Sequence, residues 1–247
     1  MDKSLYIAMT GAKNNMLSQA IHANNMANVS TTGFRSDFEQ ARAMGVYYGE
    51  GYATRAYALT ENPSSNFASG PMVQTGNDLD IAIQGDGFIA VRANDGTEGY
   101  TRAGNLEIDS AGTLRTANGL AVLGGDSPIV IPENEKIQIG ADGTVSIVGL
   151  GQGPEAMTEV GRIKLVNPNT QNLTKSDDGL FRQRDGLNAE ASAEVKLRSG
   201  FVENSNVNAI DEFTKIMALS RQYEMQVKMM KTADDNAVSS ASLLRMS

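Results

Sequence analysis

The last part of the chain, residues 203–247, decides the fold and reads ENSNVNAIDEFTKIMALSRQYEMQVKMMKTADDNAVSSASLLRMS. From Ala209 onward, apolar residues recur at alternating steps of three and four, and Ser220 and Asp234 fill two polar slots. This alternation is the heptad pattern of a helix that packs against another helix. No Pro follows Pro168 and no Gly follows Gly200, so nothing interrupts a helix of about 35 residues. The apolar members of this C-terminal seam are Phe213, Ile216, Tyr223, Val227, Met230, Ala237, Ala241 and Leu244.

The beginning of the chain carries a matching pattern. Residues 3–28 read as an amphipathic helix rich in Met, Ala and Leu, and the cluster Ser30-Thr31-Thr32-Gly33 ends it. This N-terminal seam has one polar member, Gln19, and its apolar members are Leu5, Met9, Ala12, Met16, Ala23 and Met26. Two helices at opposite ends of the sequence, each with a narrow apolar stripe, indicate a subunit built to assemble.

Three asparagines, Asn24, Asn25 and Asn28, stand just before the end of the N-terminal helix. Asn24 and Asn28 are one turn apart and share a face. The group either marks a fraying helix end, where Asn is tolerated, or hydrogen-bonds to a neighbour. A solvated helix end does not need three amides, which favours the second interpretation.

The charge of the chain argues against nucleic acid as its main ligand. The 247 residues carry a formal net charge of −8 and no basic stripe of the kind that binds phosphates. Residues 203–247 hold six acidic and five basic side chains, a net −1, and residues 1–34 hold Asp2, Lys3 and Lys13, a net +1. Like charge therefore does not keep the two helices apart.

The hydropathy of the sequence indicates where the protein is located. No apolar run approaches the roughly 18 residues of a membrane span, so we expect no direct insertion in a membrane. The start does not resemble a cleavable signal peptide, because residues 5–12 are apolar only at helical spacing and Asn14 and Asn15 follow directly. The residues alone predict a cytoplasmic protein or one exported by an unusual route, and the lack of Cys fits either.

In the middle of the chain, apolar residues recur with a different period from that of the two helices. From Leu79 onward apolar residues alternate with polar ones, as in Leu79, Ile81 and Ile83. Six Asx-Gly dipeptides separate these short runs and supply the positive φ that hairpin turns require. They are Asp86-Gly87, Asp95-Gly96, Asn118-Gly119, Asp142-Gly143, Asp178-Gly179 and Asp185-Gly186.

We therefore predict a discontinuous α+β fold with four parts: an N-terminal helical part (1–35), an extended linker (36–78), an antiparallel β-domain (79–202) and a C-terminal helix (203–247). The linker shows no clear period. Its four tyrosines stand among glycines, which suits either an extended contact segment or a surface loop; they are Tyr47, Tyr48, Tyr52 and Tyr57.

The sequence shows no residue pattern typical of a catalytic site or of a site for a cofactor. The single histidine, His22, lies on an amphipathic helix, and a zinc site is excluded in practice without Cys. The glycines of Gly149–Gly153 precede Pro154 rather than a helix, so they do not form a phosphate loop. The acidic pairs lack the twelve-residue spacing of a calcium loop. We expect no enzyme, no cofactor, no metal and no small-molecule substrate.

Several blocks resemble the bacterial flagellar rod and hook axial proteins. Residues 24–35, NNMANVSTTGFR, match the family signature N-N-L-A-N-x-x-T-x-G-F-[KR], with Met26 in place of the commoner Leu. Residues 79–88 and 100–105 are similar to β-domain motifs of the family, and residues 203–207 and 221–225 to its C-terminal motifs. The start of the chain and residues 176–181, SDDGLF, look most like proximal-rod members. Distal-rod members are the nearest alternative, and hook-type members, which are expected to be longer, are the other.

The resemblance implies a structural subunit of the flagellar drive shaft. Such a subunit leaves the cell uncleaved through the flagellar type III export apparatus and polymerises in the periplasm with copies of itself and other rod subunits. Its terminal helices would pair into an inner tube around the export channel, with the β-domain outside. The expected assembly interface comprises the seams and the motifs: Leu5, Met9, Ala12, Met16, Ala23, Asn24, Asn25, Met26, Asn28, Gly33, Phe34, Asn204, Asn206, Val207, Phe213, Ile216, Tyr223, Glu224, Val227, Met230, Asp234, Ala237 and Leu244.

Burial against a single partner helix does not offset the entropy of ordering so long a helix. We therefore expect neighbouring subunits to cover the remaining faces, and both termini to be mobile in the free monomer and helical in the polymer. A carboxylate on a seam is costly unless paired, so we expect Asp234 to bond an amide or base on an adjacent helix. Ser220 reads as a tolerated break.

One alternative of another class is an extracellular carbohydrate-binding or carbohydrate-cleaving β-protein with coiled-coil tails. An aromatic groove with two facing carboxylates in the β-domain would favour it. The absence of Trp weighs against it.

Overall fold

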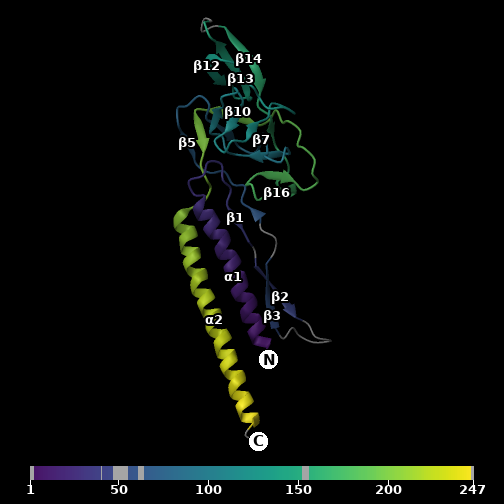
Figure 1. Cartoon of the computed structure of the whole chain (residues 1–247), viewed down its shortest axis with the longest axis vertical. Coiled ribbons are helices and arrows are strands. Elements are labelled where there is room, and N and C mark those ends of the chain that lie inside the picture. The colour runs from purple at the N-terminus through teal and green to yellow at the C-terminus, as the bar shows by residue number, and fades with distance from the viewer. Residues whose placement is uncertain (1–2, 40, 47–54, 61–63, 152–155, 246–247) are drawn as a thin grey trace. The chain divides into compact units, whose positions relative to one another are not determined.

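The computed structural model describes residues 3–39, 41–46, 55–60, 64–151 and 156–245 (Figure 1). They form two compact units. The helical unit contains residues 1–28, 37–66 and 207–247, and the β unit contains residues 29–36 and 67–206.

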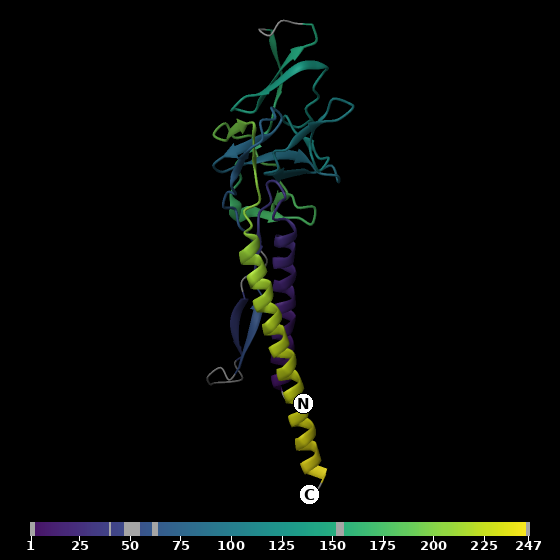
Figure 2. The same cartoon turned by 90° about the vertical axis from the view of Figure 1, so that its left-hand side faces the viewer.

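The helical unit is built on two helices, α1 (Lys3–Ala27) and α2 (Ala209–Arg245). They pack side by side, as Figures 1 and 2 show from two directions. The expected terminal helices and their pairing are thus confirmed. Helix α1 matches the expected 3–28 to within one residue, because the Thr-Gly cluster stops it, and no Gly or Pro interrupts α2. Helix α2 begins at Ala209, six residues after the expected start at residue 203, because residues 203–206 belong to the β unit.

The expected linker, residues 36–78, contains paired strands that the sequence analysis did not predict, and four of them belong to the helical unit. Strands β2 (Ala41–Val46) and β3 (Arg55–Thr60) pair as an antiparallel hairpin, and β1 (Asp37–Phe38) pairs with β4 (Ser64–Ser65). Ala and Gly are weak strand formers and hide the period of this hairpin in the sequence. Of the linker tyrosines, Tyr57 lies in β3, and Tyr47, Tyr48 and Tyr52 lie outside the described residues.

The β unit is antiparallel in every strand pair described, as expected. Its main sheet has the order β16-β17-β8-β7-β11-β10-β9, with β15 also paired to β7. The strands are β7 (Phe88–Arg92), β8 (Glu98–Thr101), β9 (Leu106–Ile108), β10 (Leu114–Thr116), β11 (Ala121–Val122), β15 (Leu165–Val166), β16 (Leu173–Lys175) and β17 (Phe181–Gln183).

Three smaller sheets complete this unit. Strands β12 (Asn134–Ile139), β13 (Thr144–Gly149) and β14 (Met157–Arg162) form a three-stranded sheet. The long-range pairs are β18 (Lys196–Ser199) with β6 (Ile81–Gln84), and β19 (Phe201–Glu203) with β5 (Met72–Gln74). The only helical turn described in this unit is a 3₁₀ turn at Thr170–Asn172.

The turn chemistry of the sequence is confirmed in the β unit. The glycines of all six Asx-Gly dipeptides have positive φ, between 72° and 130°. Four of the dipeptides close hairpins; these are β7–β8, β10–β11, β12–β13 and β16–β17. The period-two side chains between the turns fill one apolar core that includes Ile81, Ile89 and Val145.

The β unit extends beyond the expected limits of 79–202. It takes in residues 67–78 of the expected linker and two additions from the expected helical parts, residues 29–36 from the N-terminal side and residues 203–206 from the C-terminal side. Both additions belong to family motifs that we had expected to serve the helices. Their contacts, given below, are with the β strands.

Candidate assembly surfaces

The two long sides of α2 differ in exposure. The less exposed positions recur at alternating steps of four and three, which is the spacing of a helix seam. They are Glu212, Ile216, Leu219, Tyr223, Gln226, Met230 and Ala233, and Ser220, next to Leu219, is also half-buried. The seam of the structure therefore shares Ile216, Tyr223 and Met230 with the expected seam.

The other expected positions lie one residue away from this inner seam. The structure places Glu212 and Gln226 inward, and the apolar neighbours Phe213 and Val227 outward, 52% and 41% exposed. Their assignment to the contact with the other helix was therefore wrong. The sequence pattern selected the apolar residue of each pair, whereas the inner contacts of α2 are partly polar.

The outward face of α2 is rich in large apolar side chains. It includes Ile210, Phe213, Met217, Met225, Val227, Met229 and Val238, each more than 40% exposed. Helix α1 likewise exposes Tyr6, Met9, Met16, Leu17 and Met26. We call these two sets the outer stripes. Large apolar side chains exposed in this number on two paired helices suit an interaction surface on a soluble protein.

The inner face of α1 carries small side chains. Ala8 and Ala12 are buried, and a Cβ added to Gly11 would lie 3.0 Å from the side-chain amide of Gln226. Leu5 is half-buried, whereas Met9, Met16, Ala23 and Met26 are exposed. Of the expected N-terminal seam, Ala12 is thus the buried member, and most of the others lie on the outside of the pair.

Helix α2 continues past the start of α1. The helices run antiparallel, because His22 contacts Glu212 and Gly11 lies against Gln226. With 25 residues in α1 and 37 in α2, the last turns of α2 have no α1 residue beside them (Figures 1 and 2). Asp234 and Ala237 are exposed there, and the side chain of Leu244 lies outside the described residues. The premise that Asp234 sits on a buried seam is corrected.

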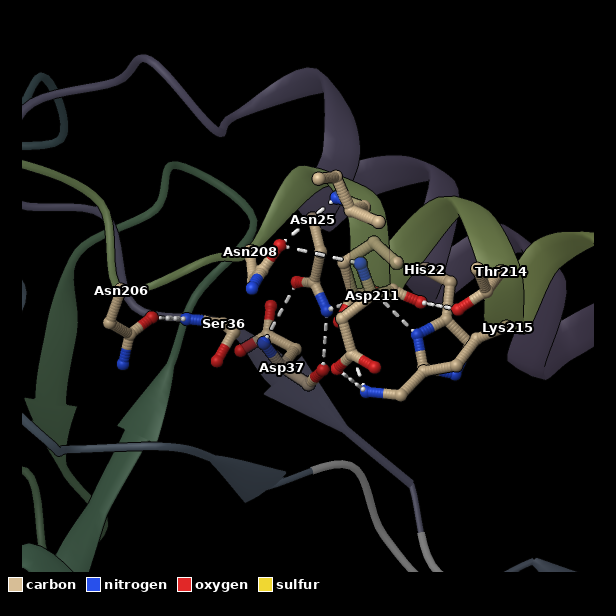
Figure 3. A network of polar contacts seen from close by, with 11 residues as sticks. His22, Asn25, Ser36, Asp37, Asn206, Asn208, Asp211, Thr214 and Lys215 are labelled. Carbon is tan, nitrogen blue, oxygen red and sulfur yellow. Dashed lines mark hydrogen bonds and ion pairs between the residues drawn. The ribbon is translucent and has the colours of Figure 1, made fainter.

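A polar cluster joins the end of α1 to the start of α2 (Figure 3). Asn25 is 1% exposed, donates from Nδ2 to Asp37 O at 2.8 Å and accepts from Asp37 N at 2.9 Å. Its Nδ2 also lies 3.4 Å from Glu212 Oε2, which is 2.5 Å from His22 Nδ1. The amide of Asn25 therefore holds the chain entering β1 against both helices.

The other two asparagines behave differently. Asn28 donates from Nδ2 to Asn24 O at 2.9 Å, which is the local bond of a helix end. Asn24 is exposed. Bonding to another segment is thus confirmed for Asn25, within the same chain, while Asn28 fits the interpretation as an ordinary helix end.

The charged cluster of the helical unit is completed by Lys215. Its ammonium group lies 2.6 Å from Asp211 Oδ2 and 3.5 Å from Glu212 Oε1. The hydrogen bond to Asp211 raises the pKa of Lys215. These pairs hold the first turns of α2, where Asn208 also caps the helix by accepting from Ile210 N at 3.0 Å.

In the β unit, three family motifs meet at one buried carboxylate. Glu203 Oε1 lies 2.8 Å from Arg35 Nη2 and accepts from Gly70 N at 2.8 Å, while Oε2 accepts from Arg102 Nη1 at 2.9 Å. The side chains of Arg35 and Glu203 are 0% exposed and that of Arg102 is 3% exposed. We call this cluster the Arg–Glu–Arg triad.

Neighbouring motif residues also find partners within the chain. Asn206 accepts from Ser36 N at 2.8 Å (Figure 3). It also donates to Ala68 O at 2.9 Å. Gly33 has φ +69°, and a Cβ there would lie 2.2 Å from the carbonyl carbon of Arg102. The ammonium group of Lys175 stands 4.0 Å above the ring of Phe34. These motif residues organise the β unit.

The remaining motif residues lie nearer the surface. Asn204 and Val207 are half-buried and Glu224 is exposed. The sequence expectation missed Arg35, Arg102 and Glu203 as a group. Each stands in a motif that was quoted, yet periodicity gives no signal that residues 35, 102 and 203 meet.

Among the described residues, no group of three or more His, Cys, Asp or Glu side chains could hold a metal ion. None of the described helices combines the length and the hydropathy that crossing a membrane requires.

Comparison with known proteins gives the family. Residues 5–35 match the family described as flagella basal body rod protein, residues 82–147 the flagellar hook protein FlgE/F/G D1 domain, and residues 198–243 the flagellar basal body rod FlgEFG protein C-terminal family. The chain belongs to the flagellar basal-body rod protein family. This confirms the resemblance seen in the sequence.

Individual relatives align along the whole chain. The flagellar basal-body rod proteins FlgF of Salmonella typhimurium and Escherichia coli are 39% and 38% identical over 100% of both chains. The flagellar basal-body rod protein FlgG of Bacillus subtilis is 32% identical over 95% of this chain and 96% of its own. The comparisons favour a rod subunit over the carbohydrate-active alternative.

Proposed function

We propose that this chain is a structural subunit of the proximal rod of the bacterial flagellar basal body. The observation that carries the proposal is the full-length similarity to two proteins named FlgF, at 39% and 38% identity against 32% for one named FlgG. The helical unit supports it, because its two terminal helices expose apolar stripes that a rod subunit would cover on assembly. In this role the chain acts as part of a drive shaft and transmits torque.

The outer stripes are the surface through which we propose that the helices assemble. Fully burying one such side chain contributes roughly 1.5–3 kcal/mol, and association costs about 4–15 kcal/mol in lost freedom of motion. Seven large apolar residues on α2 and five on α1 are enough to offset that cost even when each is only partly covered. Copies of this chain and other rod subunits, arranged around the export channel, are the proposed partners.

The remaining turns of α2 extend this surface. Asp234 is exposed, and in the proposed assembly its carboxylate bonds an amide or a base of an adjacent subunit. An Asp234→Ala variant should then fold as before but assemble less well. Unchanged assembly and motility would remove this role from Asp234.

The proposed route to the rod is export without a cleaved signal peptide, through the flagellar type III apparatus, followed by assembly in the periplasm. Both terminal helices are proposed to open easily in the free monomer, which suits passage through a narrow channel. The protein is proposed to act without enzymatic activity, cofactor or small-molecule substrate. No nucleic-acid partner is proposed, in keeping with the net charge of −8.

Deletion of the gene in its flagellated host tests the proposal. The expected result is that rod assembly stops within the proximal part, leaving the proximal rod itself incomplete, and that the wild-type chain supplied in trans restores complete rods and motility. Rods that reach full length without this protein would overturn the proximal assignment. A shaft that stops after the proximal subunits would assign it to the distal rod instead.

A further inference from the structure

The Arg–Glu–Arg triad is unusual in its charge. It places two guanidinium groups and one carboxylate in the interior of the β unit, a net charge of +1. The exposed carboxylate of Asp86 adds a weaker attraction to Arg102, and Lys175 adds another cation, donating to Arg35 O at 2.9 Å. Burial lowers the pKa of Arg102, because the charged guanidinium group loses the stabilisation that water would give it.

The cluster is also incompletely hydrogen-bonded. Within the described chain, Arg35 Nε and Nη1 and Arg102 Nε have no hydrogen-bond partner. Arg35 Nη2 is 2.8 Å from Glu203 Oε1 but is not aligned for a hydrogen bond. Buried charges of this kind are tolerated only when their counter-charge is in place.

The two arginines of the triad precede its carboxylate in the sequence. Arg35 and Arg102 come first, and Glu203 comes 101 residues after Arg102. Glu203 ends β19, which pairs with β5, and its own carbonyl accepts from Gly33 N at 2.7 Å. Until Glu203 is in place, closing the β unit would bury two like charges together with only the weaker attraction of the exposed Asp86 to offset them.

We propose that Glu203 acts as a gate on folding, so that the β unit closes only after the segment leading into α2 has docked. The gate makes folding wait for the C-terminal side of the unit, although almost all of its core residues precede Glu203 in the chain. A nearly complete chain therefore stays open, and the unit closes when its last strand arrives. Glu203 is a positioning residue that acts through the two arginines.

Refolding and unfolding kinetics of the full-length chain test this proposal. Pulsed amide exchange in β6 and β7, whose side chains are largely buried, follows closure of the β unit. Glu203→Gln keeps the shape of the side chain and removes its charge. Glu194→Gln, an exposed acid in the same unit, is the control for the loss of one negative charge.

If Glu203 gates folding, Glu203→Gln slows refolding by roughly a hundredfold or more, with a smaller change in the unfolding rate, whereas Glu194→Gln changes neither rate. Wild-type refolding with faster unfolding in Glu203→Gln would overturn the proposal, because it would mean that Glu203 only holds the finished structure together.

A triple variant with Arg35→Met, Arg102→Met and Glu203→Met decides the outcome if Glu203→Gln does not fold at all. It removes the like charges along with the counter-charge, so the proposal expects it to refold faster than Glu203→Gln. A triple variant that refolds no better than Glu203→Gln would also overturn the proposal.

Discussion

Replacement of Asn25 by Ala tests the polar cluster that joins the two helices to β1. The amide of Asn25 makes two hydrogen bonds with the backbone of Asp37, at 2.8 and 2.9 Å, in a site that is 1% exposed. Each such bond contributes about 0.5–1.5 kcal/mol net, and loss of the amide also removes both bonds from the backbone N–H and carbonyl of Asp37. Asn25→Ala should therefore destabilise the helical unit by about 2 kcal/mol.

Amide exchange in the free monomer measures this effect. A loss of about 2 kcal/mol corresponds to roughly 30-fold faster exchange for amides that open together with the helix pair. The expected change is confined to the last turns of α1 and the first turns of α2, because Glu212 lies next to the lost amide. Exchange in the β unit serves as the internal reference.

Asn24→Ala is the matched control, because Asn24 is adjacent in sequence and exposed. Its effect should stay within about 0.5 kcal/mol, the usual range for surface substitutions. Equal effects of the two substitutions, or no effect of Asn25→Ala, would refute the assignment of Asn25 as the bond between the helices and β1.

Three further predictions concern single positions. Gly33→Ala should destabilise the β unit by about 2 kcal/mol or more in urea unfolding, because φ is +69° and the added Cβ would lie 2.2 Å from a backbone carbon of Arg102. Gly11→Ala should keep or raise thermal stability, because Ala favours a helix by about 1 kcal/mol and only the flexible end of a glutamine is 3.0 Å away. The hydrogen bond from Arg115 lowers the pKa of Asp109 in the folded protein. The ionised carboxylate of Asp109 therefore stabilises the fold above its ordinary pKa, and this stabilisation is lost as the pH falls through the lower pKa of the folded state. The urea concentration at the unfolding midpoint should therefore decrease when the pH is lowered below about 4. Asp109→Asn should make this midpoint depend less on pH.

The sequence predicted the elements of the fold well because local signals set them. Uninterrupted helix formers define α2, and Asx-Gly dipeptides supply the positive φ at Gly96, Gly119 and Gly143. The β2–β3 hairpin was missed, because Ala and Gly in its strands give little periodic signal. Local patterns therefore gave the element types and most of their limits.

Contacts between distant segments could not be predicted in the same way. The heptad pattern placed Phe213 and Val227 on the inner seam, yet the structure puts Glu212 and Gln226 there. A shift by one residue turns a helix face by about 100°, and Glu212 finds polar partners in His22 and Asn25 that a hydropathy pattern does not detect. The Arg–Glu–Arg triad joins residues 35, 102 and 203, which only the folded chain brings together.

The most direct test of the assembly surface uses thiol labelling of the outer stripes. The natural chain has no Cys, so Met16→Cys and Met217→Cys each introduce a single reactive thiol at a position that is 58% or 43% exposed. The account predicts that both thiols react readily in the monomer and lose most of their reactivity in assembled rods. Equal reactivity in monomer and rod would contradict the claim that neighbouring subunits cover these stripes.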